Sequence, residues 1–359
     1  MSEALHERFD KYADLAIRVG LNLQQGQRLV IRAPVEAVEL TRALTAKAYE
    51  VGCPYVDVVF SDEQLELIRF ERAPRDSFEE FPMWRVKGMI ERAADGAAFL
   101  SIVGNNPELL KEQDPDLVAL TRKIASEASK PLSRDYFSNM RVSWCVISAA
   151  VGPWAARVFP DVPAHQQIGK LWDAIFQMCR LDEADPRAAW QEHIEALERR
   201  RAYLNDKAYT ALKYTAPGTD LTLGLPEGHI WKGGVDTNAA GTMFVPNLPT
   251  EEVFTMPHSQ RTNGMVSSTK PLNYGGTLID NFSLTFQDGR VVGVEAETGR
   301  DVLKKLVETD EGAARLGEVA LVPHSSPISK FGRLFYNTLF DENASNHVAL
   351  GQAYNVCVE

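Results

Sequence analysis

The feature that most constrains the fold is a regular alternation of short apolar runs with longer amphipathic stretches in the first half of the chain. The apolar runs predict buried strands, and the stretches between them, with apolar residues at helical spacing, predict helices. Repeats of this kind favour a mostly parallel sheet with helices on its faces. The predicted strands are 28–34, 55–60, 97–104 and 143–150, and the predicted helices are 36–53, 84–94, 116–129, 165–180 and 187–205.

The second half of the chain has a different texture. After about residue 206 glycine and threonine become more frequent, and short alternating runs replace the long helices. Residues 210–225 and 282–297 predict β-hairpins, the second with its turn at Asp288 and Gly289. Only 299–308 predicts a further clear helix. The second half is therefore expected to form a β-rich α+β domain.

These patterns predict two domains, an α/β domain over residues 1–205 and a β-rich domain over 206–359. The last predicted helix before the boundary contains "EHIEALERRRAYL", whose charged face is expected to lie in solvent. The net charge of −11 argues against nucleic acid or an anionic membrane as a partner, because both select basic surfaces. The N-terminus has no apolar segment of a signal peptide, so a cytoplasmic protein is expected.

Several common site motifs are missing or weak. No G-x-G-x-x-G follows a predicted strand, which leaves dinucleotide binding without its fingerprint. The spacing Ser267-x-x-Lys270 occurs in one class of serine enzymes, but the companion motifs of that class are absent. The four cysteines are far apart and form no C-x-x-C pair, so free buried thiols are expected.

The stretch "DENASNHVALGQAY", residues 341–354, is too polar for a core and contains more acidic, amide, histidine and tyrosine side chains than a linker needs. His347 is a candidate metal ligand because imidazole and carboxylate groups together bind the cations that activate water. If the stretch were helical, Tyr354 would lie on the same side as His347, two turns further on.

Two acids are notable for their apolar surroundings. Glu318 begins an apolar strand in "LGEVALVP", and Glu252 precedes an apolar segment in "PTEEVFTMP". Either could be a solvated residue at a strand end, or a carboxylate whose burial a metal compensates. Because Glu251 and Glu252 are adjacent, an extended segment would point them to opposite faces, so only one is expected to bind a metal.

Several long motifs in a fixed order resemble the M29 family of metalloaminopeptidases, the aminopeptidase T-like group. The resemblance covers most of the chain and includes an N-terminal stretch starting at "YADLAIRVGLNLQQGQ". The motifs in the second half are "NLPTEEVFTMPH", "NGMVSSTKPLNYGGTLIDN", "LGEVALVP" and "SPISKFGRLFYNTLFDENASNHVALGQAY".

The resemblance implies a homodimeric, metal-dependent aminopeptidase that binds two divalent ions (zinc, cobalt or manganese) and acts on peptides with a free N-terminus. It assigns Glu252, Glu318 and His347 as metal ligands and places Tyr354 near the metals. The family completes its site with a His-x-Asp pair, and no H-x-D occurs in this sequence. We therefore expect the three ligands to hold one ion but not two, and the catalytic domain to be incomplete at Glu359.

The expected mechanism is attack on the N-terminal peptide bond by a metal-activated water. Glu318 is expected to bridge the ions, Glu318 or Glu251 to transfer the proton, and Tyr354 to donate a hydrogen bond to the oxyanion. The alternative is a non-catalytic or truncated relative that binds a small molecule or a metal without turnover.

Overall fold

The computed structural model describes residues 3–274 and 277–359. The chain forms two compact units. Unit 1 comprises Met1–Ile194 with Val235–Thr250, and unit 2 comprises Glu195–Gly234 with Glu251–Glu359. Helix α8 (Pro186–Lys207) contributes its first half to unit 1 and its second half to unit 2. The predicted boundary between residues 205 and 206 stays a prediction.

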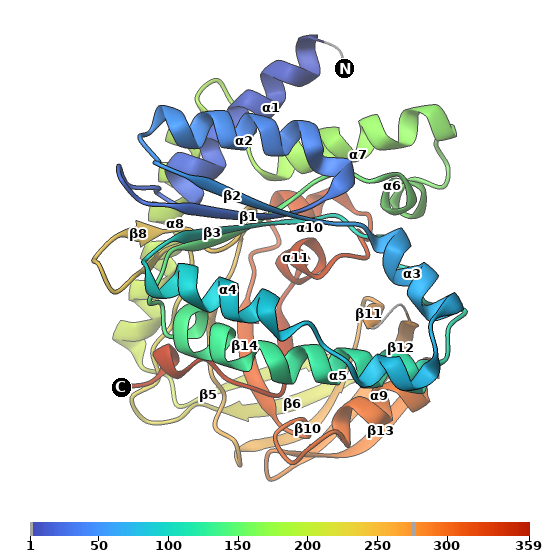
Figure 1. Cartoon of the computed structure of the whole chain (residues 1–359). Coiled ribbons are helices and arrows are strands. Elements are labelled where there is room, and N and C mark those ends of the chain that lie inside the picture. The colour runs from blue at the N-terminus through green and yellow to red at the C-terminus, as the bar shows by residue number, and fades with distance from the viewer. Residues whose placement is uncertain (1–2, 275–276) are drawn as a thin grey trace. The chain divides into compact units, whose positions relative to one another are not determined.

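Unit 1 is built on a four-stranded parallel sheet in the order β2-β1-β3-β4. Within unit 1, Figure 1 shows α1, α2 and α7 on one side of this sheet and α4 and α5 on the other. Parallel neighbours cannot be joined by a tight turn, so each connection has to cross over a face, and helices fill these connections. The strands are β1 (Leu29–Pro34), β2 (Val56–Ser61), β3 (Ala98–Val103) and β4 (Trp144–Ser148).

The helices of unit 1 include the predicted ones at 36–53, 84–94, 116–129 and 165–180, and the predicted helix at 187–205 corresponds to α8, which both units share. Apolar side chains of α4 and α5 pack with Val30 and Phe99 of the sheet, which explains their helical apolar spacing. The helices are α1 (Glu3–Leu15), α2 (Val38–Glu50), α3 (Glu63–Arg72), α4 (Met83–Ala94), α5 (Pro115–Leu132), α6 (Gly152–Val158) and α7 (Ala164–Met178). A short ribbon of β7 (Asp236–Thr237) and β8 (Met243–Phe244) also belongs to this unit.

Unit 2 is β-rich. Its larger sheet is antiparallel in the order β11-β12-β10-β6-β5, with β13 also paired to β12. Both predicted hairpins are confirmed. The turn between β5 and β6 is at Pro217 and Gly218, and Gly218 has a positive φ. The turn between β12 and β13 is at Asp288 and Gly289, and each of these two residues has a positive φ. The strands are β5 (Ala211–Ala216), β6 (Thr219–Gly224), β10 (Thr262–Ser267), β11 (Leu272–Tyr274), β12 (Thr277–Gln287) and β13 (Arg290–Thr298), and helix α9 (Arg300–Val307) packs against the last two.

A second, three-stranded antiparallel sheet of unit 2 has the order β15-β14-β9. Its strands are β9 (Val253–Thr255), β14 (Leu316–Leu321) and β15 (His347–Leu350), and the short helices α10 (Pro327–Phe331) and α11 (Thr338–Asp341) lie between the last two in sequence. Trp231 and Leu197 are fully buried in the core of this unit. The expected fold class, an α/β part followed by a β-rich α+β part, is confirmed. Within the described residues, no helix combines the length and apolarity needed to cross a membrane.

Gly317 allows an irregular pairing between β14 and β15. The register shifts between Leu316 and Glu318, so Gly317 sits in a bulge that sets the position of Glu318. A Cβ atom at residue 317 would lie 2.4 Å from the carbonyl oxygen of Gln352 and 2.6 Å from that of Gly351. Because both contacts are with backbone, a side chain cannot be accommodated by a rotamer change.

We expect Gly317→Ala to lower the free energy of unfolding by about 1–3 kcal/mol, because β14 and the chain after β15 must move apart. Urea denaturation of the purified protein measures the loss. Gly88→Ala is the matched control, since a Cβ atom at this position of α4 would have no neighbour within 4 Å. That control is expected to be neutral or to stabilise by about 0.5–1 kcal/mol. Equal stabilities for the two variants would contradict the proposed crowding at Gly317.

Candidate metal centre

The register of the three-stranded sheet brings Glu252, Glu318 and His347 together. His347 lies opposite Ala320 of β14, and Ala320 lies opposite Phe254 of β9. Directly opposite residues of antiparallel strands point to the same face, so these three form one row across the sheet. Glu318 and Glu252 each lie two residues from a member of this row and therefore point to the same face.

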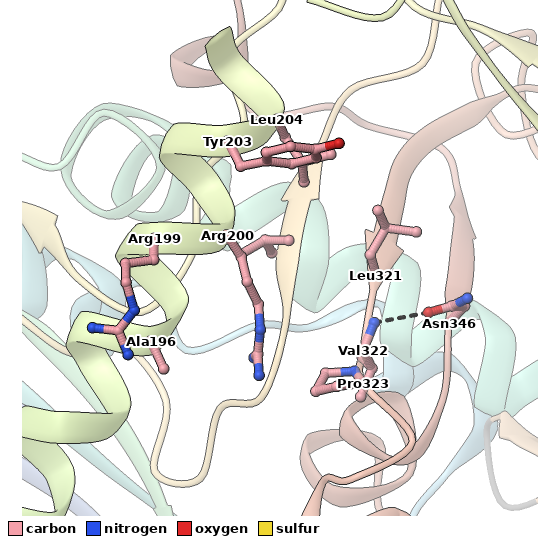
Figure 2. A pocket seen from close by; sticks show the side chains of 10 residues that line it. Ala196, Arg199, Arg200, Tyr203, Leu204, Leu321, Val322, Pro323 and Asn346 are labelled. Carbon is pink, nitrogen blue, oxygen red and sulfur yellow. Dashed lines mark hydrogen bonds between the residues drawn. The ribbon is translucent and has the colours of Figure 1, made fainter. Parts of the chain in front are cut away.

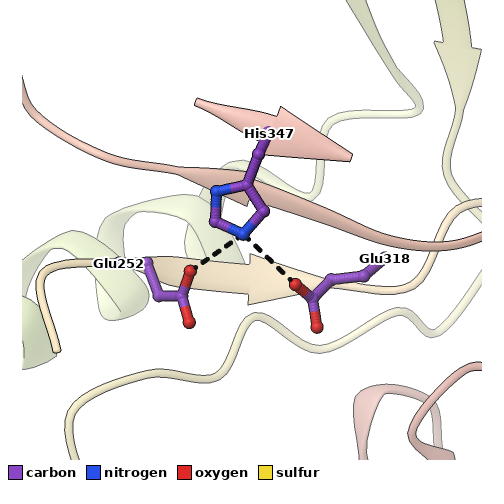
Figure 3. Close-up of side chains that lie close together, drawn as sticks. All are labelled: Glu252, Glu318 and His347. Atoms are coloured by element: carbon purple, nitrogen blue, oxygen red, sulfur yellow. Dashed lines mark ion pairs between the residues drawn. The ribbon is translucent and has the colours of Figure 1, made fainter. Parts of the chain in front are cut away.

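The side chains of the three residues converge over the small side chain of Ala320. The Nε2 atom of His347 lies 3.1 Å from Oε2 of Glu252 and 3.4 Å from Oε1 of Glu318 (Figure 3). One possible ligand atom from each residue lies within 4.8 Å of the other two. Across residues 3–274 and 277–359, no other group of three or more His, Cys, Asp or Glu side chains is placed to hold a metal ion.

The electrostatics of this cluster suit a cation. Burial by itself lowers the pKa of His347, but the carboxylates of Glu252 and Glu318 outweigh that effect and raise the pKa to about 11. Within the described chain, Oε2 of Glu252 and Nε2 of His347 are buried and make no hydrogen bond of acceptable geometry, although they face each other as an ion pair. Two carboxylates and one imidazole form a donor set that binds zinc, cobalt or manganese. The residues present therefore fit a divalent metal ion.

The ring orientation of His347 is fixed from the opposite side. Its Nδ1 atom lies 3.1 Å from the carbonyl oxygen of Ser345. A backbone carbonyl can only accept, so Nδ1 carries the proton of this bond and the lone pair of a neutral ring lies on Nε2. The nitrogen that faces the two carboxylates is thus the one available to a metal.

Two amides of the 341–354 stretch hold the segments that carry the cluster. Asn343 is fully buried, accepts a hydrogen bond from the backbone N–H of Glu251 at 2.7 Å and donates one to the carbonyl oxygen of Leu339. Asn346 accepts a hydrogen bond from the backbone N–H of Val322 at 2.8 Å. These bonds connect the start of β9 and the end of β14 to the residues just before His347. The two amides therefore help to position the segments from which Glu252, Glu318 and His347 extend.

The remaining sequence-predicted residues lie at the margin of the cluster. Glu251 is buried but is not one of the three converging side chains, as the alternation argument predicts. The ring of Tyr354 lies 6.0 Å from that of Phe254. Phe254 is the middle residue of β9 and belongs to the cross-strand row that also contains His347. The helical alternative for 347–354 is wrong, because His347–Leu350 is strand β15.

Glu342 is the neighbouring carboxylate that sequence reasoning missed. Burial raises its pKa to about 8, and the negative charges of Glu252 and Glu318 add to the rise while His347 opposes it. These electrostatic neighbours place Glu342 beside the cluster without making it one of the three converging groups. The available signal was its position five residues before His347 in an unusually polar stretch.

Ser267, by contrast, donates its hydroxyl proton to the carbonyl oxygen of Gly218, an ordinary structural role.

Comparisons with known proteins agree with this geometry. A family model described as "Thermophilic metalloprotease (M29)" matches residues 5–359. "Aminopeptidase 2" of Geobacillus stearothermophilus is 50% identical over 98% of this chain and 85% of its own length. "Aminopeptidase T" of Thermus thermophilus is 44% identical over 99% of this chain and 87% of its own length.

The fold is also similar to that of a solved structure. The structure described as "Wild-type AmpT from Thermus thermophilus" superposes with a TM-score of 0.93 at 43% identity, covering 98% of this chain and 87% of the other. The family match spans both units, and the relatives' similarity covers nearly the whole chain. The chain belongs to the M29 family of metalloproteases.

Proposed function

We propose that the protein is a metal-dependent aminopeptidase that hydrolyses the N-terminal peptide bond of peptides. The observation that carries the proposal is the convergence of Glu252, Glu318 and His347 on one face of the three-stranded sheet. Relatives named aminopeptidases, 44–50% identical to this chain, support this function over metal or small-molecule binding without turnover.

Glu252, Glu318 and His347 are the residues that would hold a divalent ion. Such an ion supplies Lewis-acid chemistry, in that it lowers the pKa of water towards neutrality and polarises a carbonyl oxygen. Zinc, cobalt or manganese would suit this donor set, and the family leads us to expect two such ions, with Glu318 the carboxylate that both would use. Glu252, Glu318 and His347 would hold one ion, and a second would need ligands besides these three.

Two other residues of the chain have chemical tasks in the proposed reaction. Glu342 can hold a proton near neutral pH, since its pKa is about 8, and it lies among the charges of the cluster. We assign it the transfer of a proton to the departing amine, a role for which Glu251 and Glu318 were the expectation from sequence. Tyr354 would donate a hydrogen bond to the oxyanion that forms from the scissile carbonyl.

The charge of the cluster explains the preference for a free N-terminus. Glu252 and Glu318 present two carboxylates on one face, and the chain as a whole carries a net charge of −11. With a metal ion held there, we infer that the free amine of the substrate would be recognised by the metal or by an acid beside it, and a blocked N-terminus would forfeit this interaction. The proposal further places the protein in the cytoplasm as a homodimer, with peptides and not nucleic acids or membranes as its partners.

We expect Glu318→Gln to abolish metal uptake as well as activity, because an amide lacks the negative charge of the carboxylate. The loss of affinity should exceed the roughly 10–100-fold that follows loss of a group outside the ligand set. Metal content by elemental analysis and release of aminomethylcoumarin from an aminoacyl substrate are the two measurements. Glu227→Gln, an exposed acid of the same unit, is the control. Full metal content in Glu318→Gln would exclude this residue as a ligand.

We expect Tyr354→Phe to lower kcat by about 100-fold with little change in KM or metal content, since only the bond to the developing charge is removed. Steady-state kinetics with the same substrate measure the effect. Tyr55→Phe, at an exposed tyrosine of unit 1, controls for the loss of a hydroxyl group. A kcat near that of the unmodified protein would remove Tyr354 from the reaction.

We expect Glu342→Gln to lower kcat by about 10²–10⁴-fold while the protein still binds metal, because glutamine cannot transfer a proton. The comparison with Glu318→Gln is decisive, since the two acids are assigned different tasks. Kinetics and metal analysis are carried out on the same preparations. Loss of metal from Glu342→Gln would instead make Glu342 a ligand, and unchanged kcat would leave it without a role.

A further inference from the structure

A pocket of about 660 Å³ in unit 2 lies apart from the cluster of Glu252, Glu318 and His347. Helix α8 forms one wall, and the end of β14 with the following residues forms the other (Figure 2). Small-molecule sites in proteins measure roughly 300–1,000 Å³, so this volume suits an organic molecule and exceeds the need of a single inorganic ion. Residues that line it include Arg200, Tyr203, Val253, Leu321, Pro323 and Asn346.

The pocket lies behind the face that carries the candidate metal centre. Val253 and Leu321 are opposite each other in the sheet, and each is adjacent in sequence to a residue of the front face, Glu252 and Ala320 respectively. Side chains alternate between the two faces of a strand, so Val253 and Leu321 point away from the cluster. The two sites therefore use opposite faces of the same strands.

The charge of the pocket is positive. Its lining contains Arg199 and Arg200 and no acidic residue, although the chain as a whole is acidic. Figure 2 shows Arg200 extending from α8 into the space in front of Val322 and Pro323. Its Nη1 atom is buried and has no hydrogen-bond partner among the residues that the structure describes. Buried polar atoms are rarely left unpaired, and a guanidinium group has the geometry to bind a carboxylate through two parallel bonds.

An apolar surface completes the pocket. The Oδ1 atom of Asn346 already accepts from the backbone N–H of Val322, and the nitrogen of this amide points away from Arg200 in Figure 2, so Arg200 is the donor assigned to a ligand. Leu321 and Pro323 supply aliphatic surface near Arg200, whereas Val253 is only 2% exposed and adds little. An anion with an apolar portion can contact both the guanidinium group of Arg200 and the aliphatic side chains, whereas inorganic phosphate can contact only the guanidinium group favourably.

We propose that this pocket binds a small organic carboxylate with an apolar side chain, such as an N-acylated amino acid or a short peptide with a blocked N-terminus. The carboxylate pairs with Arg200, and the apolar portion packs on Leu321 and Pro323. The site uses none of the three residues proposed to hold the metal.

Isothermal titration calorimetry of the full chain with N-acetyl-leucine tests the proposal. This probe has a carboxylate and an apolar side chain but no free amine for hydrolysis. N-acetyl-leucinamide is the matched probe without the carboxylate, and inorganic phosphate is the probe without the apolar part. We expect N-acetyl-leucine to bind about tenfold or more tightly than either of the others, in line with one charge-assisted, bidentate contact. Equal binding of the amide would overturn the proposed role of the carboxylate, and equal binding of phosphate that of the apolar surface.

Variants locate the binding. Arg200→Gln should weaken N-acetyl-leucine binding about tenfold or more, and Arg200→Lys should restore it in part. Arg290→Gln removes an exposed positive charge from the same unit outside the pocket and should leave binding unchanged. Glu318→Gln should also leave it unchanged, with or without added metal, which separates this site from the metal centre. Binding that survives Arg200→Gln, or that is lost in Glu318→Gln, would overturn the proposal, and thermal melting of each variant verifies that it is folded.

Discussion

The antiparallel register of β9, β14 and β15 is the constraint on which the candidate metal centre depends. Three residues from distant parts of the sequence meet because Ala320 lies opposite both His347 and Phe254. The flanking positions of the same face then carry Glu318 and Glu252. Since side chains alternate along a strand, a shift of one residue in any of the three would turn one ligand to the other face. The bulge at Gly317 and the hydrogen bonds of Asn343 and Asn346 hold the register where the ladder is short.

The cluster is also an electrostatic compromise. Removing two carboxylates from water is costly unless positive charge is placed next to them. In the protein without metal, His347 supplies that charge, which is why its pKa is raised to about 11 in spite of burial. A metal ion held by these residues would provide the compensating positive charge instead of that proton, so metal binding would compete with one proton. Burial raises the pKa of Glu342, and the negative charges of Glu252 and Glu318 add to that rise, so the carboxylates that suit the site to a cation also favour the protonated form of a neighbouring acid.

Much of the fold follows from local pattern, and the site follows only in part. The apolar runs of the first half predict the parallel sheet of unit 1, and the turn residues Asp288 and Gly289 predict the hairpin between β12 and β13. Glu252 and Glu318 are conspicuous as acids beside apolar segments, and family resemblance assigns their role. The strand at His347–Leu350 could not be distinguished from a helix because four residues carry too little periodicity. Glu342 was missed because its importance arises from charges brought close by long-range pairing.

Local sequence pattern also fails to predict which arginine of helix α8 has a buried nitrogen. The sequence predicts a solvated charged face, and Arg199 is exposed as expected, but Arg200 is only partly exposed and has a buried nitrogen. Which arginine is buried depends on where the helix meets β9 and β14, and the helix sequence does not contain that information. The three-stranded sheet has the acidic cluster on one face and the arginine-containing pocket on the other. Because side chains alternate along a strand, Glu252 points to the first face and Val253 to the second. The acids in front are paired with His347, and none of the described residues that line the pocket behind is acidic, so the pocket lining offers Arg200 no compensating charge.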